Sequence, residues 1–117
     1  MRRVAYGGES FITSDDGAAA LLEFAAMAAM SGVAEVVSIP TVLADGRVVV
    51  VDLVIGPSSE LLTSPIETTL RDPDTRAATL ALRTRASQLG ASSSHVRGGA
   101  IAALDLAAPD GGDPEPF

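Results

Sequence analysis

Asp52 is the residue with the clearest potential for chemistry, because it is a carboxylate within a run of aliphatic side chains. It belongs to the segment 48–55, Val-Val-Val-Val-Asp-Leu-Val-Ile. A carboxyl group buried in such a run would be poorly hydrated, which is how many catalytic acids and bases are tuned. Nothing nearby in the sequence supplies a second catalytic group. We therefore favour a structural role, in which Asp52 meets Ser38 or an arginine or points to solvent, with catalysis as the alternative.

A second set of candidates lies in residues 91–99, Ala-Ser-Ser-Ser-His-Val-Arg-Gly-Gly. His95 is the only histidine, so any histidine-based acid or base must be this one. Serine hydroxyls, Arg97 and the backbone N–H groups near Gly98 and Gly99 could bind an anion. The spacing matches no phosphate-binding loop, however. We therefore interpret this stretch as a flexible link, with His95 as the catalytic candidate and Arg97, Gly98 and Gly99 as ligand-binding candidates.

The rest of the sequence contains no motif that names a reaction. It has no Walker-type loop and no Gly-x-Ser-x-Gly. The absence of cysteine excludes disulfides, thiolate metal sites and cysteine nucleophiles. The acidic pairs at residues 15–16 and 72–74 each begin a predicted helix, so helix capping explains them without a metal ion. We therefore expect no metal and no cofactor, and we favour a protein that is not an enzyme.

Composition narrows the class of protein and its partners. The chain has 117 residues, of which 47% are hydrophobic and 20% charged, and this indicates one globular domain. Its formal net charge of −7 is a poor match for nucleic acid or for an anionic membrane, and 3% aromatic residues disfavour stacking on bases. The apolar run 18–30 is shorter than the roughly 20 residues that span a bilayer. We expect an acidic cytoplasmic protein that binds neither nucleic acid nor membrane.

The first predicted elements are one or two short strands and a helix. Residues 2–12 alternate loosely around a Gly-Gly pair and predict one short strand or two half-strands. Ser14 and its neighbours supply N-cap oxygens for a helix that ends near Ser31, where Gly32 suits the left-handed C′ position. This helix has almost no polar face. Either its alanines remain exposed, or it is covered on two sides, by its own sheet and by another subunit.

A β-hairpin is predicted around the turn Asp45-Gly46. A two-residue loop would pair Asp52 with Ile39, whereas a three-residue loop with glycine in the left-handed position pairs Asp52 with Ser38. We prefer the second register because it groups polar with polar and apolar with apolar side chains. The core face of the second strand then consists of Val49, Val51, Leu53 and Ile55. Its other face consists of Val48, Val50 and Val54 around Asp52.

Proline and glycine shape the predictions for the second half of the chain. Pro40 and Pro65 cannot donate to a ladder, so we expect their strands at a sheet edge or at a bulge. The β-prone stretch 60–70 predicts a third strand. A second helix is expected over 72–89, with Gly90 as its C′ residue. The residues predicted to be buried in this helix are Ala77, Ala78, Leu80, Ala81, Leu82 and Leu89.

The predicted element order is β-α-β-β-(β)-α-(β). It describes an α+β fold with a mostly antiparallel sheet of three to five strands and two helices packed on one face. If the stretch 60–70 is a loop, the order becomes the split βαβ of ferredoxin-like folds. The single domain is expected over 1–106, with 91–99 as a flexible link and 100–106 as a possible last strand. Residues 107–117, rich in Pro, Gly and Asp, predict a disordered acidic tail.

The functional prediction depends on the apolar second face of the hairpin, because a large apolar surface is rarely left exposed to water. The predicted interface residues are Val48, Val50, Val54, Met27 and Met30. We expect a homodimer that also engages a protein partner, as an adaptor or chaperone-like module without catalysis. The alternative is a small-molecule-binding protein or an enzyme, with a pocket between sheet and helices lined by Asp52, His95 or Arg97.

Overall fold

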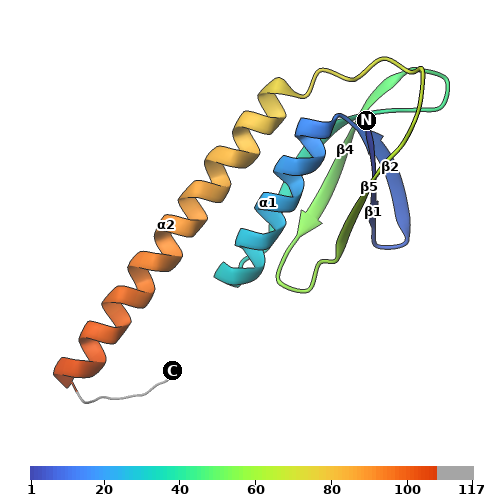
Figure 1. The fold of residues 1–117 in the computed structure, drawn as a ribbon. Helices are drawn as coiled ribbons and strands as arrows, with labels where there is room; N and C mark the ends of the chain where they lie inside the picture. The colour runs from blue at the N-terminus through green and yellow to red at the C-terminus, as the bar shows by residue number, and fades with distance from the viewer. Residues whose placement is uncertain (108–117) are drawn as a thin grey trace.

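The fold is that of a computed structural model, which describes residues 1–107 and, within them, the side chains of residues 1–91. Its elements are β1 (Arg2–Tyr6), β2 (Glu9–Thr13), α1 (Asp15–Ser31), β3 (Glu35–Val42), β4 (Val48–Ile55), β5 (Leu61–Pro65) and α2 (Arg76–Ala107). The strands form one antiparallel sheet in the order β4-β3-β2-β1-β5, and both helices lie on the same side of it (Figure 1). The predicted α+β class is therefore confirmed.

The N-terminal strands form a hairpin of two complete strands. β1 and β2 pair antiparallel, with Val4 opposite Phe11. Gly7 and Gly8 make the turn at φ values of 60° and 82°, which are accessible to glycine at little cost. Because the chain begins with two strands and β5 is also a real strand, the ferredoxin-like variant is wrong.

The register of β3 against β4 is the one that polar and apolar matching predicts. Ser38 lies opposite Asp52, Ile39 opposite Val51 and Val37 opposite Leu53. The loop has three residues, because the N–H of Leu43 donates to the carbonyl of Arg47 at 2.8 Å. Gly46 ends this loop at a φ of 89°, as the three-residue turn requires.

The two prolines occupy different places in the sheet. Pro65 ends β5, which is an edge strand as predicted. Pro40 lies in β3, which is not an edge strand but stands between β4 and β2. The pairing between β2 and β3 consists of Ile12 opposite Val42, and beside it the Thr13 hydroxyl donates to the Pro40 carbonyl at 2.8 Å. Proline is tolerated here because the ladder on that side is so short.

Helix α1 begins and ends as its sequence predicts. The Ser14 hydroxyl accepts a hydrogen bond from the N–H of Gly17 at 2.9 Å and also contacts the Thr75 hydroxyl at 2.5 Å. At the other end Gly32 has a φ of 69°, and its N–H donates to the carbonyl of Ala28 at 2.9 Å. The N-cap therefore also connects α1 to the segment that leads into α2.

Part of the second side of α1 is covered by α2 of its own chain. The side chains of Leu21, Phe24 and Ala28 are fully buried between the sheet and α2. Where the two helices meet, the methyl group of Met27 lies 2.7 Å from the place that a Cβ atom at residue 90 would occupy. Gly90 is therefore a point of close helix approach and not the end of a helix.

Helix α2 differs from its prediction in bounds and in phase. It starts at Arg76 instead of residue 72 and continues through the predicted link 91–99 and the predicted strand 100–106 to Ala107. Glycine is a poor helix residue but not a forbidden one, and no proline interrupts the stretch. The remaining tail, 108–117, lies outside the described residues.

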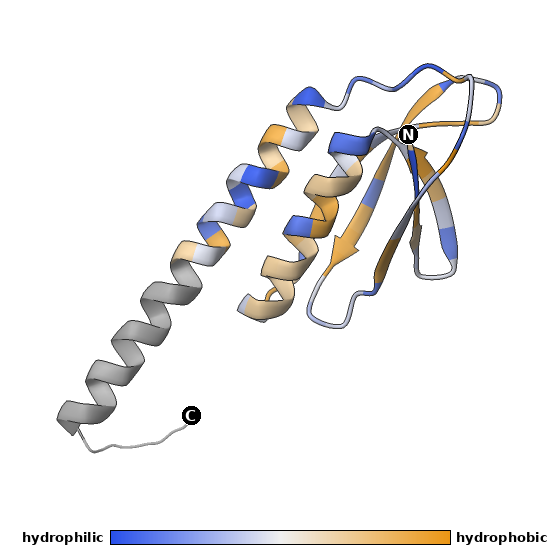
Figure 2. Cartoon of the chain, viewed as in Figure 1, coloured by the Kyte–Doolittle hydropathy of each residue, from blue (hydrophilic) through white to orange (hydrophobic). Residues whose placement is uncertain are grey.

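The buried stripe of α2 is also narrower than predicted. Leu82, Ala86 and Leu89 face the core, whereas Ala77, Leu80 and Ala81 are exposed and Ala78 is half-buried. Hydrophobic and hydrophilic residues are mixed along the coloured N-terminal part of α2, while α1 is hydrophobic over most of its length (Figure 2). With alanine on several sides of the helix, apolar spacing alone does not define which side is buried.

The cap of α1 gives a first prediction. We expect Ser14→Ala to lower the free energy of unfolding by about 1–2 kcal/mol, because it removes an N-cap acceptor and the contact with Thr75. Urea denaturation followed by circular dichroism measures this difference. Ser10→Ala, on the exposed face of β2, is the matched control and should stay close to the parent protein. Equal stability of the two variants would contradict the role of the cap.

Candidate functional site

Asp52 lies on an exposed face of β4, and the Ser38 hydroxyl donates to its Oδ1 at 2.5 Å. This is one of the structural arrangements expected from the sequence. The burial that would tune a catalytic carboxyl group is missing here. Asp52 is instead an exposed side chain hydrogen-bonded to its cross-strand neighbour.

Around Asp52 the hairpin presents four exposed valines, which we call the outer valine face: Val36, Val48, Val50 and Val54. Their exposed fractions are 70%, 55%, 63% and 58%, respectively. The opposite side of β4 turns to the core, where Leu53 and Ile55 are buried and Val49 and Val51 are half-buried. The prediction that β4 carries one core face and a second, largely apolar face is therefore confirmed.

Val36 is the member of this face that the sequence analysis missed. It lies directly opposite Val54 across the strands. The signal was available, because the chosen register already pairs these two residues on the face that carries Asp52.

The two predicted interface methionines lie in the helical layer instead. Met27 is half-buried and packs against Gly90, and Met30 is 60% exposed near the end of α1. The outer valine face lies on the β3–β4 hairpin, where two of its members, Val36 and Val50, line a groove shared with α2. The structure therefore does not bring the methionines and the valines together into one surface.

A groove connects the outer valine face to α2. It has a volume of about 540 Å³ and lies between the β3–β4 hairpin and the N-terminal half of α2. Its walls include Val36, Pro40, Val50, Ala77, Ala81 and Arg85. A pocket between sheet and helices is thus present. Asp52 is not among its lining residues.

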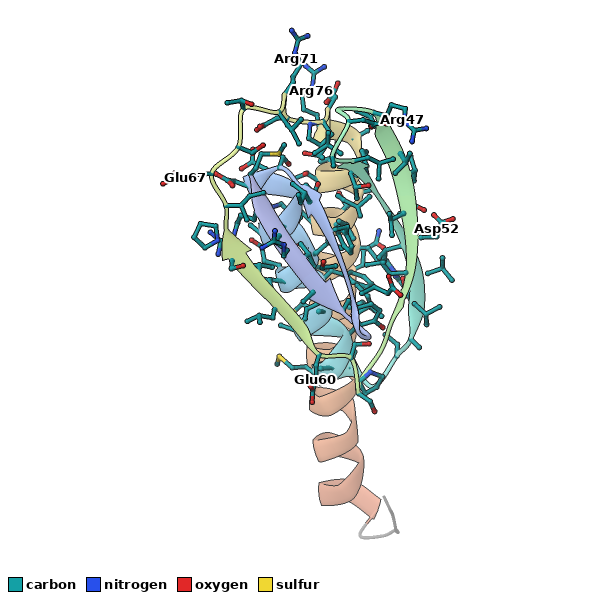
Figure 3. All side chains as sticks on the ribbon, turned by 90° about the vertical axis from the view of Figure 1, so that its right-hand side faces the viewer. Arg47, Asp52, Glu60, Glu67, Arg71 and Arg76 are labelled. Carbon is teal, nitrogen blue, oxygen red and sulfur yellow. The ribbon has the colours of Figure 1, made fainter. Side chains whose placement is uncertain are left out.

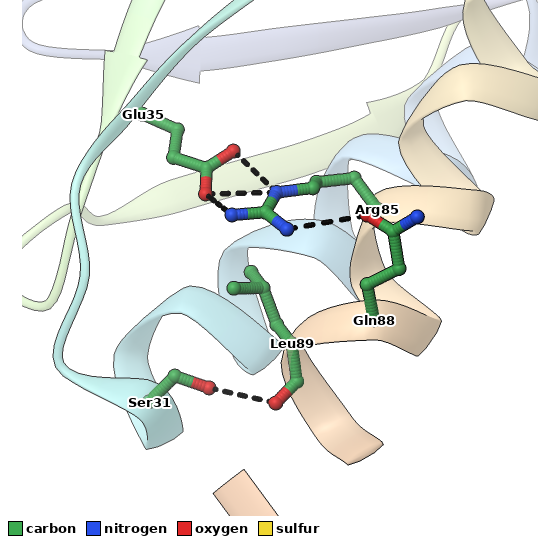
Figure 4. A network of polar contacts seen from close by, with 5 residues as sticks. All are labelled: Ser31, Glu35, Arg85, Gln88 and Leu89. Carbon is green, nitrogen blue, oxygen red and sulfur yellow. Dashed lines mark hydrogen bonds and ion pairs between the residues drawn. The ribbon is translucent and has the colours of Figure 1, made fainter. Parts of the chain in front are cut away.

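An ion pair at the groove holds α2 to the sheet. Arg85 donates from Nε to both carboxylate oxygens of Glu35 at 2.9 Å, and its Nη2 also contacts this carboxylate (Figure 4). Its Nη1 donates to the Gln88 side chain at 3.2 Å. The hydrogen-bonded guanidinium holds the pKa of Glu35 below its ordinary value, and the carboxylate raises the pKa of Arg85. One turn further on, the Ser31 hydroxyl donates to the carbonyl of Leu89 at 3.4 Å.

A larger hollow, of about 980 Å³, lies beside the β1–β2 turn and the β4–β5 loop. The Tyr6 hydroxyl is its most distinctive polar group. This hydroxyl donates to the carbonyl of Val54 and lies 2.9 Å from the Ser59 hydroxyl, which in turn accepts from the N–H of Gly56 at 2.8 Å. The polar groups thus bond to one another, and they brace the β4–β5 loop against β1.

The candidate residues His95, Arg97, Gly98 and Gly99 fall in the part of α2 whose side chains lie outside the description. Their backbone is helical, where a flexible link was predicted. In the part of the chain that the structure describes, no three potential metal ligands come together. Over that same part, no helix has the length and apolar character needed to cross a membrane.

Two further carboxyl groups with a lowered pKa, those of Asp74 and Asp45, have partners two residues away in the sequence. Asp74 accepts hydrogen bonds from the side chain and backbone of Arg76, which lower its pKa to about 2, and Asp45 has a lowered pKa through Arg47. These pairs stand at exposed positions before α2 and in the β3–β4 loop. They stabilise the local turn geometry, and nothing in their arrangement indicates a catalytic role.

Comparison with known proteins adds no further information: no family model, no curated protein and no solved structure matches this chain.

The ion pair of Glu35 with Arg85 leads to a prediction on pH. Because the folded protein holds the pKa of Glu35 below its unfolded value of 4.5, this contribution to stability is complete above that pH. It is lost as the pH falls through the lower, folded pKa. We therefore expect a shallower loss of stability on acidification in Glu35→Gln than in the parent protein, measured by urea denaturation between pH 6 and pH 2.5.

Glu60→Gln, at an exposed loop position, is the control and should follow the parent curve. The effect is that of one exposed pair and is correspondingly small. Parallel curves for Glu35→Gln and the parent protein would show that this ion pair does not stabilise the fold.

Proposed function

We propose that this protein is a non-enzymatic cytoplasmic binding module, which self-associates through the outer valine face and engages a protein partner as an adaptor or chaperone-like unit. The observation that carries the proposal is the exposure of Val36, Val48, Val50 and Val54 on one side of one hairpin. Contiguous apolar patches of this kind mark interaction sites in proteins. At roughly 25 cal/mol per Å² of buried apolar area, covering them is a favourable step.

The polar groups support binding in preference to catalysis. Asp52 is exposed and bonded to Ser38, and the Tyr6 hydroxyl is bonded to Val54 and Ser59. A catalytic acid or base needs a proton-transfer partner held in a shielded site. These groups instead sit on cross-strand or loop-bracing contacts. The net charge of −7 further supports a protein partner over nucleic acid.

Self-association through the outer valine face is tested by one exposed substitution. We expect the parent chain to show a concentration-dependent dimer in sedimentation equilibrium, and Val50→Glu to shift it to the monomer, because a carboxylate cannot be covered by valines without a large desolvation cost. Leu80→Glu is the matched control, since Leu80 is 69% exposed but lies on α2 outside the groove. It should dimerise like the parent.

Circular dichroism of both variants shows whether each is folded. A parent chain that remains monomeric at every concentration would contradict self-association. Equal dissociation by the two glutamates would place the interface elsewhere.

The groove beside α2 favours a second candidate function, the binding of a small apolar molecule. Its volume of about 540 Å³ and its valine, proline and alanine walls fall within the range of known ligand pockets. We expect decanol to raise the melting temperature of the parent chain, and Ala81→Leu to abolish the rise because its side chain fills the groove. Thr84→Leu, on α2 but outside the lining, is the control. Equal shifts in both variants would remove the groove as a ligand site.

A further inference from the structure

A hollow that we call the strand slot lies between β4 and β2. It has a volume of about 430 Å³ and is lined by Glu9–Phe11 of β2, by Val51–Val54 of β4, and by Tyr6 and Gly7. β4 is an edge strand of the sheet, and β2 pairs with β3 through Ile12. Over the part of the chain that the structure describes, the residues of both strands that line the slot therefore have one edge without a strand partner.

The main-chain groups of β4 point into the slot at every second residue. The loop between β3 and β4 closes with a main-chain hydrogen bond, and bonded pairs alternate with non-bonded pairs along an antiparallel ladder. Val51 and Leu53 therefore make the ladder bonds to β3, whereas the N–H and carbonyl groups of Asp52 and Val54 are directed away from it. The Val54 carbonyl agrees with this direction, because it accepts a hydrogen bond from the Tyr6 hydroxyl of β1.

β2 presents Ser10 to the slot in the same way. Ile12 pairs with Val42 at the edge of β2 that faces away from β1, and residues two apart in a strand direct their main-chain groups to the same edge. A single extended segment in the slot would therefore find main-chain partners in both Ser10 and Asp52. At the usual rise and spacing of strands, the volume of about 430 Å³ holds roughly three residues of such a segment.

The slot is acidic. Among the described residues that line it are the carboxylates of Glu9 and Asp52 and no basic side chain. The Asp52 side chain projects outward from β4 (Figure 3). The hollow of about 980 Å³ shares Tyr6 and Val54 with the slot and adds the carboxylate of Glu60, again with no arginine in its described lining. A partner of complementary charge therefore carries basic side chains.

We propose that the strand slot binds an extended basic segment of a protein partner, which adds a strand between β2 and β4. The main chain of the segment pairs with Ser10 on one side and with Asp52 and the N–H of Val54 on the other. The carboxylates of Asp52 and Glu9 balance its basic side chains. This inference rests on the proposed function, because it names the chemical class of the protein partner, but it does not depend on self-association.

The two faces of the slot define the side chains of the segment. Phe11, Val51 and Leu53 belong to the hydrophobic core or pack against it, so side chains directed inward meet apolar surface. Side chains directed outward lie on the exposed face that carries Asp52. Because side chains alternate across a strand, an alternation of apolar and basic residues suits both faces.

Two other occupants suit the slot less well. A second folded copy could offer only an edge strand that is attached to its own sheet, and that sheet would collide with the strand on the far side of the slot. Residues 108–117 of this chain contain three acidic residues and three prolines. The acids repel the carboxylates of the slot, and the prolines cannot donate to a ladder. A separate basic segment avoids both obstacles.

Fluorescence anisotropy with a labelled heptapeptide of alternating lysine and valine tests the binding. The full chain is titrated at about 0.15 M salt, so that distant charges are screened. We expect saturable binding. Glutamate in place of lysine should weaken it at least about tenfold through like-charge repulsion. N-methylation of alternate amide groups keeps the charge but removes the donors along one edge, and it should also weaken binding at least about tenfold.

Variants of the protein and hydrogen exchange locate the site. We expect Asp52→Asn to weaken binding of the lysine peptide at least about fivefold. Asp72→Asn makes the same charge change at an exposed position outside the slot and should stay within about twofold of the parent. The peptide should slow hydrogen exchange at the amides of Ser10, Asp52 and Val54, and leave that of Ser38 unchanged.

Each outcome supports or overturns the inference. Equal binding of the lysine peptide and its N-methylated form would indicate attraction by charge alone and overturn strand addition. Equal effects of the two asparagine variants, or protection at Ser38 in place of Asp52, would overturn the site. A chain that dimerises in sedimentation equilibrium but does not bind the lysine peptide overturns this inference while self-association stands. A monomeric chain that binds the peptide as expected supports the inference and contradicts self-association.

Discussion

The pairing of Ser38 with Asp52 determines how the rest of the molecule is arranged. Side chains alternate across a strand, so a register that turns Asp52 outward also turns its neighbours Leu53 and Val51 inward. A shift by one residue would place this carboxylate in the core and expose Leu53 and Ile55, which now belong to the core. The cost of burying the charge therefore selects the core face of β4, and the outer valine face follows from that choice.

The helical layer is held by close contact and by one ion pair. Gly90 lets α2 approach α1 at Met27, where a larger residue would displace the methionine methyl group. Further along the groove, Arg85 connects α2 to Glu35 at the start of β3. α2 therefore covers one side of α1, while Leu22 and Met30 of α1 remain exposed. The β3–β4 hairpin carries a further group of exposed apolar side chains, the outer valine face.

The hairpin could be predicted because its determinants are local. A glycine at the left-handed turn position and matched cross-strand pairs select one register from the sequence of the hairpin alone. The second helix could not be predicted in the same way. Its alanines leave the phase open, and Gly90 has the same appearance whether it ends a helix or admits Met27. The difference is a tertiary contact between segments that lie some sixty residues apart in the sequence.

The candidate surface, too, has one part that depends on local sequence and one part that depends on tertiary contacts. Val48, Val50 and Val54 follow from strand alternation, and Val36 follows once the register is applied to both strands. The groove beside them depends on where α2 lies, so it was predictable only as a space between sheet and helices.

A carboxylate at the centre of an apolar face limits which partners can cover it. Valines alone would accept almost any apolar surface, including misfolded chains and sheet edges. Asp52 makes such contacts costly, because an uncharged partner would remove its water without replacing it. A partner that carries a cation at the right distance avoids this cost. The single charge that interrupts the apolar strand thus contributes specificity, while the valines around it supply the area that favours association.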